Sequence, residues 1–216
     1  MSHLGPVEEY WAGSGEGRAT ALVVHDWFGL LPHVRAYCDR LAHHGFDAVA
    51  PDLYHGQTAT TADEAQALAG RLGLGVVRAE LDRLLVGCRR HGGAAYAIGF
   101  SVGGWFALDL AARADLDAVV AYYAIHESPR AITAPVLLHL AETDDWETSE
   151  APEQFFDGLA TTARSVKCEY EGTRHSFANA DVSAYDETAE GEAFAATVAF
   201  LRSREPGGRP WLRQVR

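Results

Sequence analysis

The sequence predicts an α/β protein in which a mainly parallel sheet is covered by helices on both faces. Short apolar runs bounded by turn residues alternate with longer stretches of helical spacing, which is the order expected of parallel strands joined by helices. The 216 residues are 48% hydrophobic and 22% charged, so the chain can bury one large core. We therefore expect a single domain over residues 1–203.

The elements follow in a regular order along the chain. Six runs are apolar almost throughout and are expected as buried strands, at residues 19–25, 46–50, 94–100, 118–124, 135–141 and 166–170. Helical spacing is found at residues 32–44, 62–72, 76–91, 103–113, 151–163 and 183–202.

The two ends of the chain lie outside the regular alternation of strands and helices. A further strand at 7–12 is expected to form a hairpin with the strand at 19 through the glycine-rich turn 13–17. Because this turn opens a strand and not a helix, it is not expected to bind a phosphate. Residues 204–216 contain Pro206, Gly207, Gly208 and Pro210, which break a helix, so we expect a flexible tail.

Composition excludes several classes of partner. Eighteen basic and thirty acidic residues give a formal net charge of -12, which disfavours binding to nucleic acid or to an anionic membrane. The N-terminus lacks the pattern of a signal peptide and no apolar run could span a membrane, so a cytoplasmic location is expected. The three cysteines, Cys38, Cys88 and Cys168, are widely spaced, which predicts reduced thiols and no metal site.

The segment from Gly99 to Gly103 indicates a catalytic serine. An apolar strand breaks at Ser101, which is flanked by small residues, and helical spacing follows directly. This is the pattern of a nucleophile elbow, where glycines allow the strand and helix to approach closely around a strained serine. The alternative is that Ser101 only caps the helix.

A serine nucleophile needs a base and an acid from loops beyond the C-terminal ends of later strands. His175 follows the last strand by a short loop and is the expected base. His139 falls inside a strand and is expected to be structural, whereas His126 is a candidate pocket residue. The acid is expected from the loop after the strand at 135–141, where Asp144 is preferred and Asp145 and Glu142 stay open.

An oxyanion hole is expected from two backbone N–H groups. The residue after the nucleophile, Val102, supplies the first. The loop after the strand at 19–25 lies at the same edge of the predicted sheet, and Trp27 is the expected second donor.

Five segments together resemble the dienelactone hydrolases of the α/β-hydrolase fold. They are His25-Asp26-Trp27-Phe28-Gly29, Ala50-Pro51-Asp52-Leu53-Tyr54, Gly99-Phe100-Ser101-Val102-Gly103-Gly104, Ala121-Tyr122-Tyr123-Ala124 and Arg174-His175-Ser176-Phe177-Ala178. They occur in consistent order across residues 19–202. The resemblance implies hydrolysis of an ester or lactone bond without a metal or organic cofactor.

The chain departs from this family at three positions. Ser101 stands where the archetypes have a cysteine nucleophile, and Asp26 stands where they have a glutamate near the thiol. Asn179 replaces an arginine that holds the substrate carboxylate, and neither Arg174 nor Arg71 matches the pattern as a substitute. A neutral ester or lactone is therefore favoured over a classical dienelactone.

The sequence thus predicts a small-molecule ester or lactone hydrolase with a Ser-His-Asp triad and an acyl-serine intermediate. The chain is too short for a large lid domain, so a shallow pocket is expected. Its candidate substrate-binding residues are Asp26, Tyr54, Tyr122, Trp146 and Phe177, beside Trp27. The aromatic residues can equally be core, and Asp26 can equally be a structural loop residue. The alternatives are a non-catalytic binding protein on the same scaffold and an acyltransferase. The sequence does not predict the oligomeric state.

Overall fold

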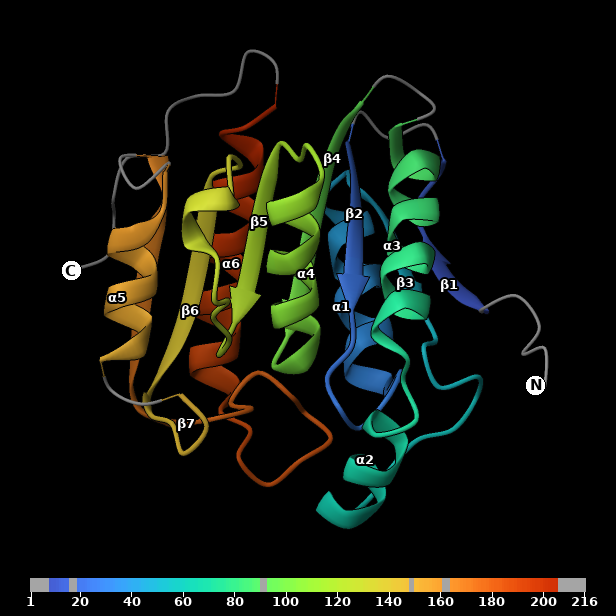
Figure 1. The fold of residues 1–216 in the computed structure, drawn as a ribbon, viewed down its shortest axis with the longest axis vertical. Helices are drawn as coiled ribbons and strands as arrows, with labels where there is room; N and C mark the ends of the chain where they lie inside the picture. The colour runs from blue at the N-terminus through green and yellow to red at the C-terminus, as the bar shows by residue number, and fades with distance from the viewer. Residues whose placement is uncertain (1–7, 16–18, 90–92, 148–149, 161–163, 206–216) are drawn as a thin grey trace.

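A seven-stranded sheet organises the part of the chain that the computed structural model describes, residues 8–15, 19–89, 93–147, 150–160 and 164–205. The strand order is β1-β3-β2-β4-β5-β6-β7, and all neighbouring pairs are parallel except β1 and β3. The strands are β1 (Glu9–Ala12), β2 (Ala19–Val24), β3 (Asp47–Pro51), β4 (Ala94–Phe100), β5 (Ala118–Tyr122), β6 (Val136–Thr143) and β7 (Val166–Arg174). The predicted mainly parallel sheet is confirmed (Figure 1).

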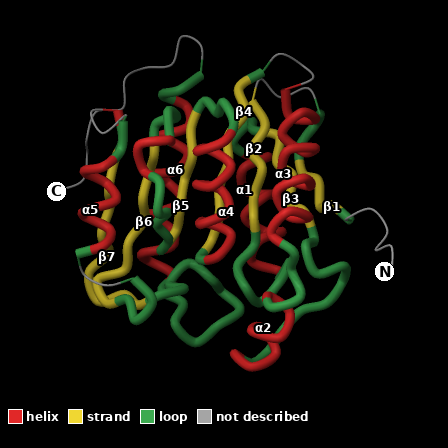
Figure 2. The backbone as a smooth tube through the Cα atoms, viewed as in Figure 1, coloured by secondary structure: helices red, strands yellow, loops and turns green. Residues whose placement is uncertain are grey.

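Helices cover both faces of this sheet (Figure 2). They are α1 (Pro32–His43), α2 (Ala62–Ala69), α3 (Leu74–Arg89), α4 (Val102–Arg113), α5 (Ala151–Gly158) and α6 (Glu187–Arg202), with a short 3₁₀ helix at Pro129–Ala131. One core contains side chains of α1 and α6, and a second core on the other face contains side chains of α2 to α5. No helix within the described ranges is long and apolar enough to cross a bilayer.

The central strands are buried on both faces, which explains their uniformly apolar sequences. Every residue of β2, β3, β4 and β5 is buried. The predicted strand at 94–100 coincides with β4, while the other predicted strands differ by a few residues at their ends. Helix α6 begins at Glu187, later than predicted, because the Asp186 carboxylate caps it by accepting a hydrogen bond from the Ala189 N–H.

The predicted hairpin between residues 7–12 and the strand at 19 is wrong. Strand β1 pairs with β3 in antiparallel register, from Glu9 opposite Pro51 to Ala12 opposite Ala48. Both edges of β2 are already occupied, by β3 on one side and β4 on the other, so β2 has no free edge for β1. Instead, the Gly15 N–H donates to Asp47 Oδ1, which ties the following turn to β3.

Some expectations concern residues outside the described ranges. The helical assignments of residues 90–91 and 161–163 are among them. So are residues 16–17 of the glycine-rich turn and residues 206–216 of the expected tail. These assignments, including the tail and the domain boundary, stay predictions.

Strand β7 forms the other edge of the sheet and is paired with β6. It is nine residues long and ends beside the loop that carries His175. Two of its buried side chains, Cys168 and Tyr170, alternate with the charged Lys167, Glu169 and Glu171. The strand therefore has an apolar face in the core that contains α6 and a charged face toward α5, where Lys167 pairs with Glu153.

Strand β4 and helix α4 are in backbone contact where they meet. A Cβ at Gly99 would lie 2.0 Å from the Gly103 carbonyl oxygen, and a Cβ at Gly103 would lie 2.2 Å from the His25 carbonyl oxygen. Side chains at these two positions are therefore excluded by backbone atoms that cannot rotate away. The glycines bring the start of α4 directly against the ends of β4 and β2.

We expect Gly99→Ala to lower the free energy of unfolding by about 1–3 kcal/mol, because the added methyl group forces the strand and helix apart. Gly191→Ala in α6 is the matched control, since a Cβ there meets no atom within 4 Å. This control should raise the unfolding free energy by up to ~1 kcal/mol through the higher helix propensity of alanine. Urea unfolding of both variants measures the difference, and equal effects would contradict the packing described for β4 and α4.

Candidate active site

Ser101 lies at a sharp turn between β4 and α4. Its backbone has φ 52° and ψ −120°, a strained conformation for a residue with a side chain. Hydrogen bonds on both sides hold the turn: the Ser101 N–H donates to the Tyr122 carbonyl, and the Trp105 N–H donates to the Ser101 carbonyl. The Ser101 side chain makes no capping hydrogen bond to α4, so helix capping does not account for this serine.

The structure brings together the three residues predicted as a triad. Ser101 Oγ lies 2.8 Å from His175 Nε2. His175 Nδ1 lies 2.9 Å and 2.8 Å from the two carboxylate oxygens of Asp144. With Nδ1–H donating to the carboxylate, Nε2 is free to accept the proton of the serine hydroxyl. This arrangement has the geometry by which a base activates a serine nucleophile.

The loop after β6 selects one of the three candidate acids. Asp144 Oδ1 also accepts hydrogen bonds from the N–H groups of Trp146 and Glu147, so the loop folds around this carboxylate. Asp145 is exposed, and the Glu142 carboxylate accepts a hydrogen bond from the Gly172 N–H instead. Asp144 is thus the acid in contact with His175.

The two backbone N–H groups expected to form an oxyanion hole belong to Trp27 and Val102. Among the described residues, no group accepts a hydrogen bond from the N–H of Trp27 or of Val102. The loop that carries Trp27 is fixed at its base by His25, whose Nδ1 lies 2.5 Å from the Asp26 carbonyl and whose Nε2 accepts from the Leu53 N–H. The contact of this loop with Gly103 keeps it beside the elbow.

Trp146 and Trp27 form an aromatic rim beside the triad. Their rings meet edge to face at 5.3 Å between centroids, and the Trp146 ring lies 6.2 Å from the His175 ring. Trp146 is 66% exposed, and Trp27 is half-buried. Of the predicted pocket aromatics, Trp146 is the one that is open to solvent.

The other candidate substrate-binding residues lie beneath this surface. Tyr122 and Phe177 are fully buried in the core, so the expectation that they border the pocket is corrected. The Tyr122 hydroxyl is hydrogen-bonded to Tyr37 and Thr197, which explains why a tyrosine is tolerated there. Tyr54 and Asp26 are also buried, and burial with the nearby Asp26 charge raises the pKa of Tyr54 to about 12.

The remaining downstream histidines have structural surroundings. His139 is fully buried, with its ring nitrogens 2.8 Å from the Tyr170 hydroxyl and 2.9 Å from the Thr197 hydroxyl. Its predicted structural role agrees with these contacts. His126 is buried against Trp105, and its Nδ1 accepts a hydrogen bond from the Ser128 N–H.

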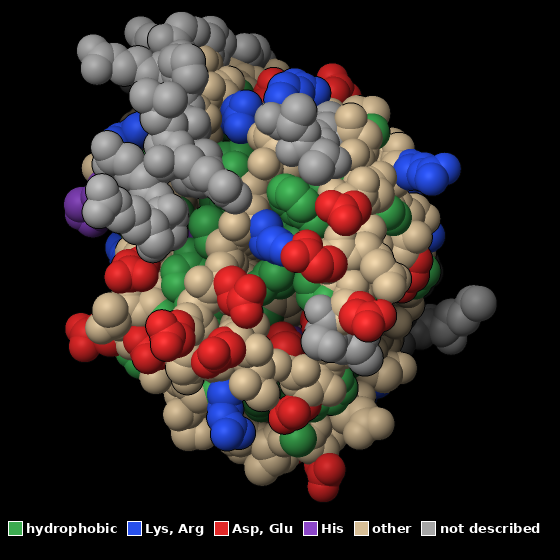
Figure 3. All heavy atoms as spheres, turned by 90° about the vertical axis from the view of Figure 1, so that its left-hand side faces the viewer, with side chains coloured by type: hydrophobic (Ala, Val, Ile, Leu, Met, Phe, Trp, Pro, Cys, Tyr) green, Lys and Arg blue, Asp and Glu red, His purple; other side chains and the backbone are tan. Residues whose placement is uncertain are grey.

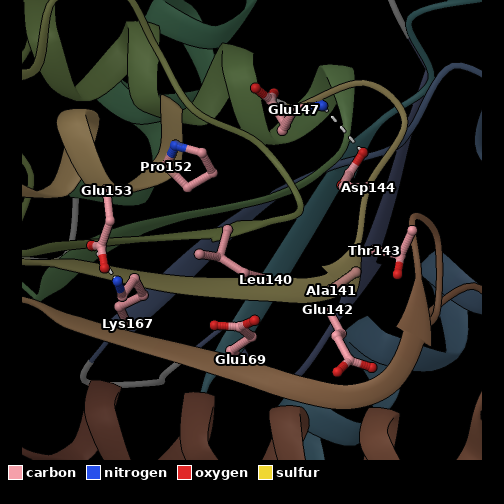
Figure 4. A pocket seen from close by; sticks show the side chains of 10 residues that line it. All are labelled: Leu140, Ala141, Glu142, Thr143, Asp144, Glu147, Pro152, Glu153, Lys167 and Glu169. Atoms are coloured by element: carbon pink, nitrogen blue, oxygen red, sulfur yellow. Dashed lines mark hydrogen bonds and ion pairs between the residues drawn. The ribbon is translucent and has the colours of Figure 1, made fainter. Parts of the chain in front are cut away.

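A cavity of about 300 Å³ opens beside the acid of the triad (Figure 4). Its lining residues come from β6, the loop after it, α5 and β7; they are Leu140, Ala141, Glu142, Thr143, Asp144, Glu147, Pro152, Glu153, Lys167 and Glu169. Five of these carry carboxylates, and the single amine, on Lys167, is paired with Glu153. Figure 3 shows acidic side chains spread over this side of the molecule. An anionic ligand is therefore disfavoured here.

Two residues of this region are not predicted by the sequence. The ring of Tyr123 lies 4.8 Å from the His175 ring, and its buried hydroxyl has no partner among the described residues. Burial raises the pKa of this hydroxyl well above its usual value, with a contribution from the Asp26 charge. Burial and the Asp144 charge likewise raise the pKa of Glu147. The segment containing Tyr123 belongs to the family resemblance, but its spacing gives no signal of a contact with His175.

The candidate substrate anchors Arg71 and Arg174 make no hydrogen bond or ion pair with the triad among the described residues. The Arg71 guanidinium donates to Gln57 on the surface, and Arg174 is exposed at the end of β7. Within the described ranges, no group of three or more His, Cys, Asp or Glu side chains is arranged to hold a metal ion.

The sheet order and the turn at Ser101 define an α/β-hydrolase. The family model of the dienelactone hydrolases matches residues 8–204, and the chain belongs to the dienelactone hydrolase family. It is accordingly a hydrolase of the class that acts on esters and lactones.

Individual relatives agree with this assignment. The chain is similar to protein usf of Aquifex pyrophilus, with 28% identity over 214 residues and 89% of each chain covered. It is 30% identical over 188 residues to a carboxymethylenebutenolidase of Rhodococcus opacus, covering 76% of this chain and 71% of that protein. The crystal structure of the dienelactone hydrolase-like promiscuous phosphotriesterase P91, from metagenomic libraries, has a TM-score of 0.73 and covers 88% of each chain at 22% identity. The last comparison shows a shared fold.

The buried His139 should make stability depend on pH. Burial lowers its pKa to about 3, whereas an unfolded histidine titrates near pH 6.5. Below about pH 6.5 the unfolded chain binds a proton that the folded chain does not, so the unfolding free energy falls as the pH falls toward 3. The slope from this group is at most about 1.4 kcal/mol per pH unit.

We therefore expect His139→Gln to have a shallower loss of stability than the native protein between pH 6 and pH 4. Urea unfolding at several pH values in this window measures both slopes. The variant should be less stable at pH 7, where histidine titration no longer contributes, because its hydrogen bonds to Tyr170 and Thr197 are altered. Parallel curves below pH 6 would contradict the assignment of His139 as a neutral core residue.

Proposed function

We propose that the protein hydrolyses a small neutral carboxylic ester or lactone through an acyl-serine intermediate. The contact that carries the proposal is the 2.8 Å approach of Ser101 Oγ to His175 Nε2, with Asp144 on the opposite side of the imidazole. The strained backbone of Ser101 supports it, because such strain is typical of residues held for catalysis.

In the first half of the proposed reaction, Ser101 Oγ attacks the acyl carbon and its proton passes to His175 Nε2. The carbonyl oxygen becomes an oxyanion, which accepts hydrogen bonds from the Trp27 and Val102 N–H groups. As the tetrahedral intermediate collapses, Nε2 gives the proton to the leaving alkoxide and the acyl group stays on the serine. Asp144 fixes the imidazole tautomer and stabilises the imidazolium.

In the second half, water attacks the acyl-serine while His175 Nε2 takes its proton. A second oxyanion forms in the same place and collapses as the proton returns to Ser101 Oγ. The products are a carboxylic acid and an alcohol, or one hydroxy acid when the substrate is a lactone. If an acceptor other than water attacked at this step, the reaction would be an acyl transfer.

The surroundings of the triad favour a neutral substrate. The cavity beside Asp144 is lined by five carboxylates, and the whole chain has a formal net charge of -12. The position at which family members hold a substrate carboxylate with an arginine is occupied by Asn179, which is fully buried. Among the described residues no Lys or Arg side chain contacts the triad, so an acidic substrate would meet mainly like charge there.

A small fluorophosphonate should form a single covalent adduct on the native protein and none on Ser101→Ala. The activated Oγ displaces fluoride at phosphorus, which increases the intact-protein mass by one phosphonyl group. Ser128→Ala is the matched control. Ser128 is an exposed serine that should not react, so this variant should form the same single adduct as the native protein. A folded native protein that forms no adduct would contradict the proposal and favour a binding role.

Substitution of Asp144 and of Asp145 in turn should show which of the two carboxylates acts as the triad acid. We expect Asp144→Asn to lower kcat on a short-chain ester by roughly 10⁴-fold, because the amide permits the wrong histidine tautomer. Asp145→Asn makes the same chemical change one residue later, at an exposed side chain, and should alter kcat less than about twofold. Steady-state kinetics test both variants, and a larger loss in Asp145→Asn would show that the acid is assigned wrongly.

A further inference from the structure

Two fully buried polar side chains, Asp26 and Asn179, form a hydrogen bond between two loops at the carboxyl ends of the strands. The Asn179 side-chain amide donates to Asp26 Oδ2 at 2.7 Å, and both residues are 0% exposed. Asp26 lies on the loop after β2, which carries Trp27, and Asn179 lies on the loop after β7, which carries His175. We refer to this hydrogen bond as the Asp26–Asn179 link.

The link fixes the backbone around Trp27. The second oxygen of Asp26, Oδ1, accepts the Phe28 N–H at 2.9 Å, and the Gly29 N–H donates to the Asp26 carbonyl at 3.3 Å. The peptide groups that follow Trp27 are therefore tied to Asp26, while the Trp27 N–H itself has no partner among the described residues. The direction of that free N–H depends on where the Asp26 carboxylate is held.

The other end of the link fixes the loop of His175. Asn179 Oδ1 accepts the Asp181 N–H at 2.8 Å, and the Asn179 N–H donates to the Ser176 carbonyl at 2.9 Å. The Phe177 N–H donates to the Arg174 carbonyl at 3.1 Å, which closes the turn around His175. The side-chain oxygen and the side-chain nitrogen of Asn179 therefore each make a hydrogen bond.

The sheet alone cannot set the distance between these two loops well. Strands β2 and β7 are separated by β4, β5 and β6, which is four interstrand spacings or roughly 19 Å. A direct side-chain hydrogen bond between the loops reduces the variation in their separation that flexing of the intervening strands would allow. Proposed catalysis needs this accuracy, because a misplacement of about 1 Å can reduce a rate about 100-fold.

We propose that Asp26 and Asn179 are positioning residues that hold the Trp27 N–H and His175 in register across the nucleophile. The inference rests on the proposed function and adds two residues to it. Neither side chain touches the substrate, since both are buried. Their effect passes through the backbone of Trp27 at one end and the turn of His175 at the other.

The chain permits a swap that tests the link. Asp26→Asn alone opposes two amide NH₂ groups, and Asn179→Asp alone opposes two carboxylates. In Asp26→Asn with Asn179→Asp, the amide introduced at position 26 donates to the carboxylate introduced at position 179, and acceptors remain for the Phe28 and Asp181 N–H groups. We expect each single variant to lose 10- to 100-fold in kcat on an ester, with a smaller change in KM, and the double variant to recover most of the loss.

A second substrate distinguishes positioning from general stability. A thionoester places sulfur where the ester places oxygen, and sulfur accepts hydrogen bonds poorly, so its hydrolysis depends less on the Trp27 N–H. The ratio of kcat/KM for the oxoester to that for the thionoester should fall in both single variants and return in the double variant. A loss of folded protein would lower the apparent kcat/KM for both substrates by the same factor and leave their ratio unchanged.

Two further variants complete the experiment. Asp109→Asn makes the same carboxylate-to-amide change at a buried side chain of α4, which pairs with Arg78 and Arg113 and has no contact with Asp26 or Asn179 among the described residues, so it should leave the ratio at the native value. Asn179→Ser removes the amide with a smaller electrostatic change and replaces Asn179→Asp if that variant does not fold. Thermal unfolding of every variant establishes that folded proteins are compared.

The outcomes separate the two proposals. A fluorophosphonate adduct on the native protein, with a ratio that is unchanged in folded Asp26→Asn and Asn179→Ser, would overturn the positioning role and leave the proposed function standing. A folded double variant without recovery would overturn it as well. No adduct on the native protein would overturn both proposals together.

Discussion

The close approach of β4 and α4 is the constraint on which the site depends. No Cβ fits at Gly99 or Gly103, because carbonyl oxygens of Gly103 and His25 occupy that space. This contact forces the chain to reverse within one residue, and Ser101 takes up the strain with φ 52°. The hydrogen bonds from Ser101 to Tyr122 and from Trp105 to Ser101 balance that strain locally. The position of the serine side chain is therefore a property of the backbone, and the acid and histidine loops are brought to it by β6 and β7.

The sequence predicted what depends on local patterns and chain order. Continuous apolar runs located the buried strands, and the rule that parallel strands end at one edge of the sheet placed Ser101, Asp144 and His175 together. The order of the strands across the sheet was harder to predict. Strand β1 pairs with β3 because β2 already has two neighbours, and no local feature of residues 7–12 indicates this. Tyr122 and Phe177 illustrate a second limit, since an aromatic side chain at a strand end can point into the core or toward a ligand with the same sequence.

The Asp26–Asn179 link illustrates a third limit. Its two residues are 153 positions apart, and a buried hydrogen bond between short polar side chains leaves no periodicity in the sequence. Each residue alone resembles an ordinary loop residue, so the pair becomes visible when the burial of both side chains is known. Burial of polar groups is unfavourable unless they are hydrogen-bonded, which is why such pairs are informative in a structure.

Strand β7 has a consequence for association of the protein. An edge strand offers its free backbone groups to any other strand that can align with it, and long regular edges are a common route to aggregation. In β7 the side chains of Lys167, Glu169 and Glu171 fall on alternate positions, and two of these three residues are exposed. In an antiparallel pair of two copies centred on Glu169, the two Glu169 carboxylates would face each other on the same side of the joined sheet. Charged side chains on β7, two of which also line the cavity next to Asp144, therefore lower the tendency of this edge to pair with another strand.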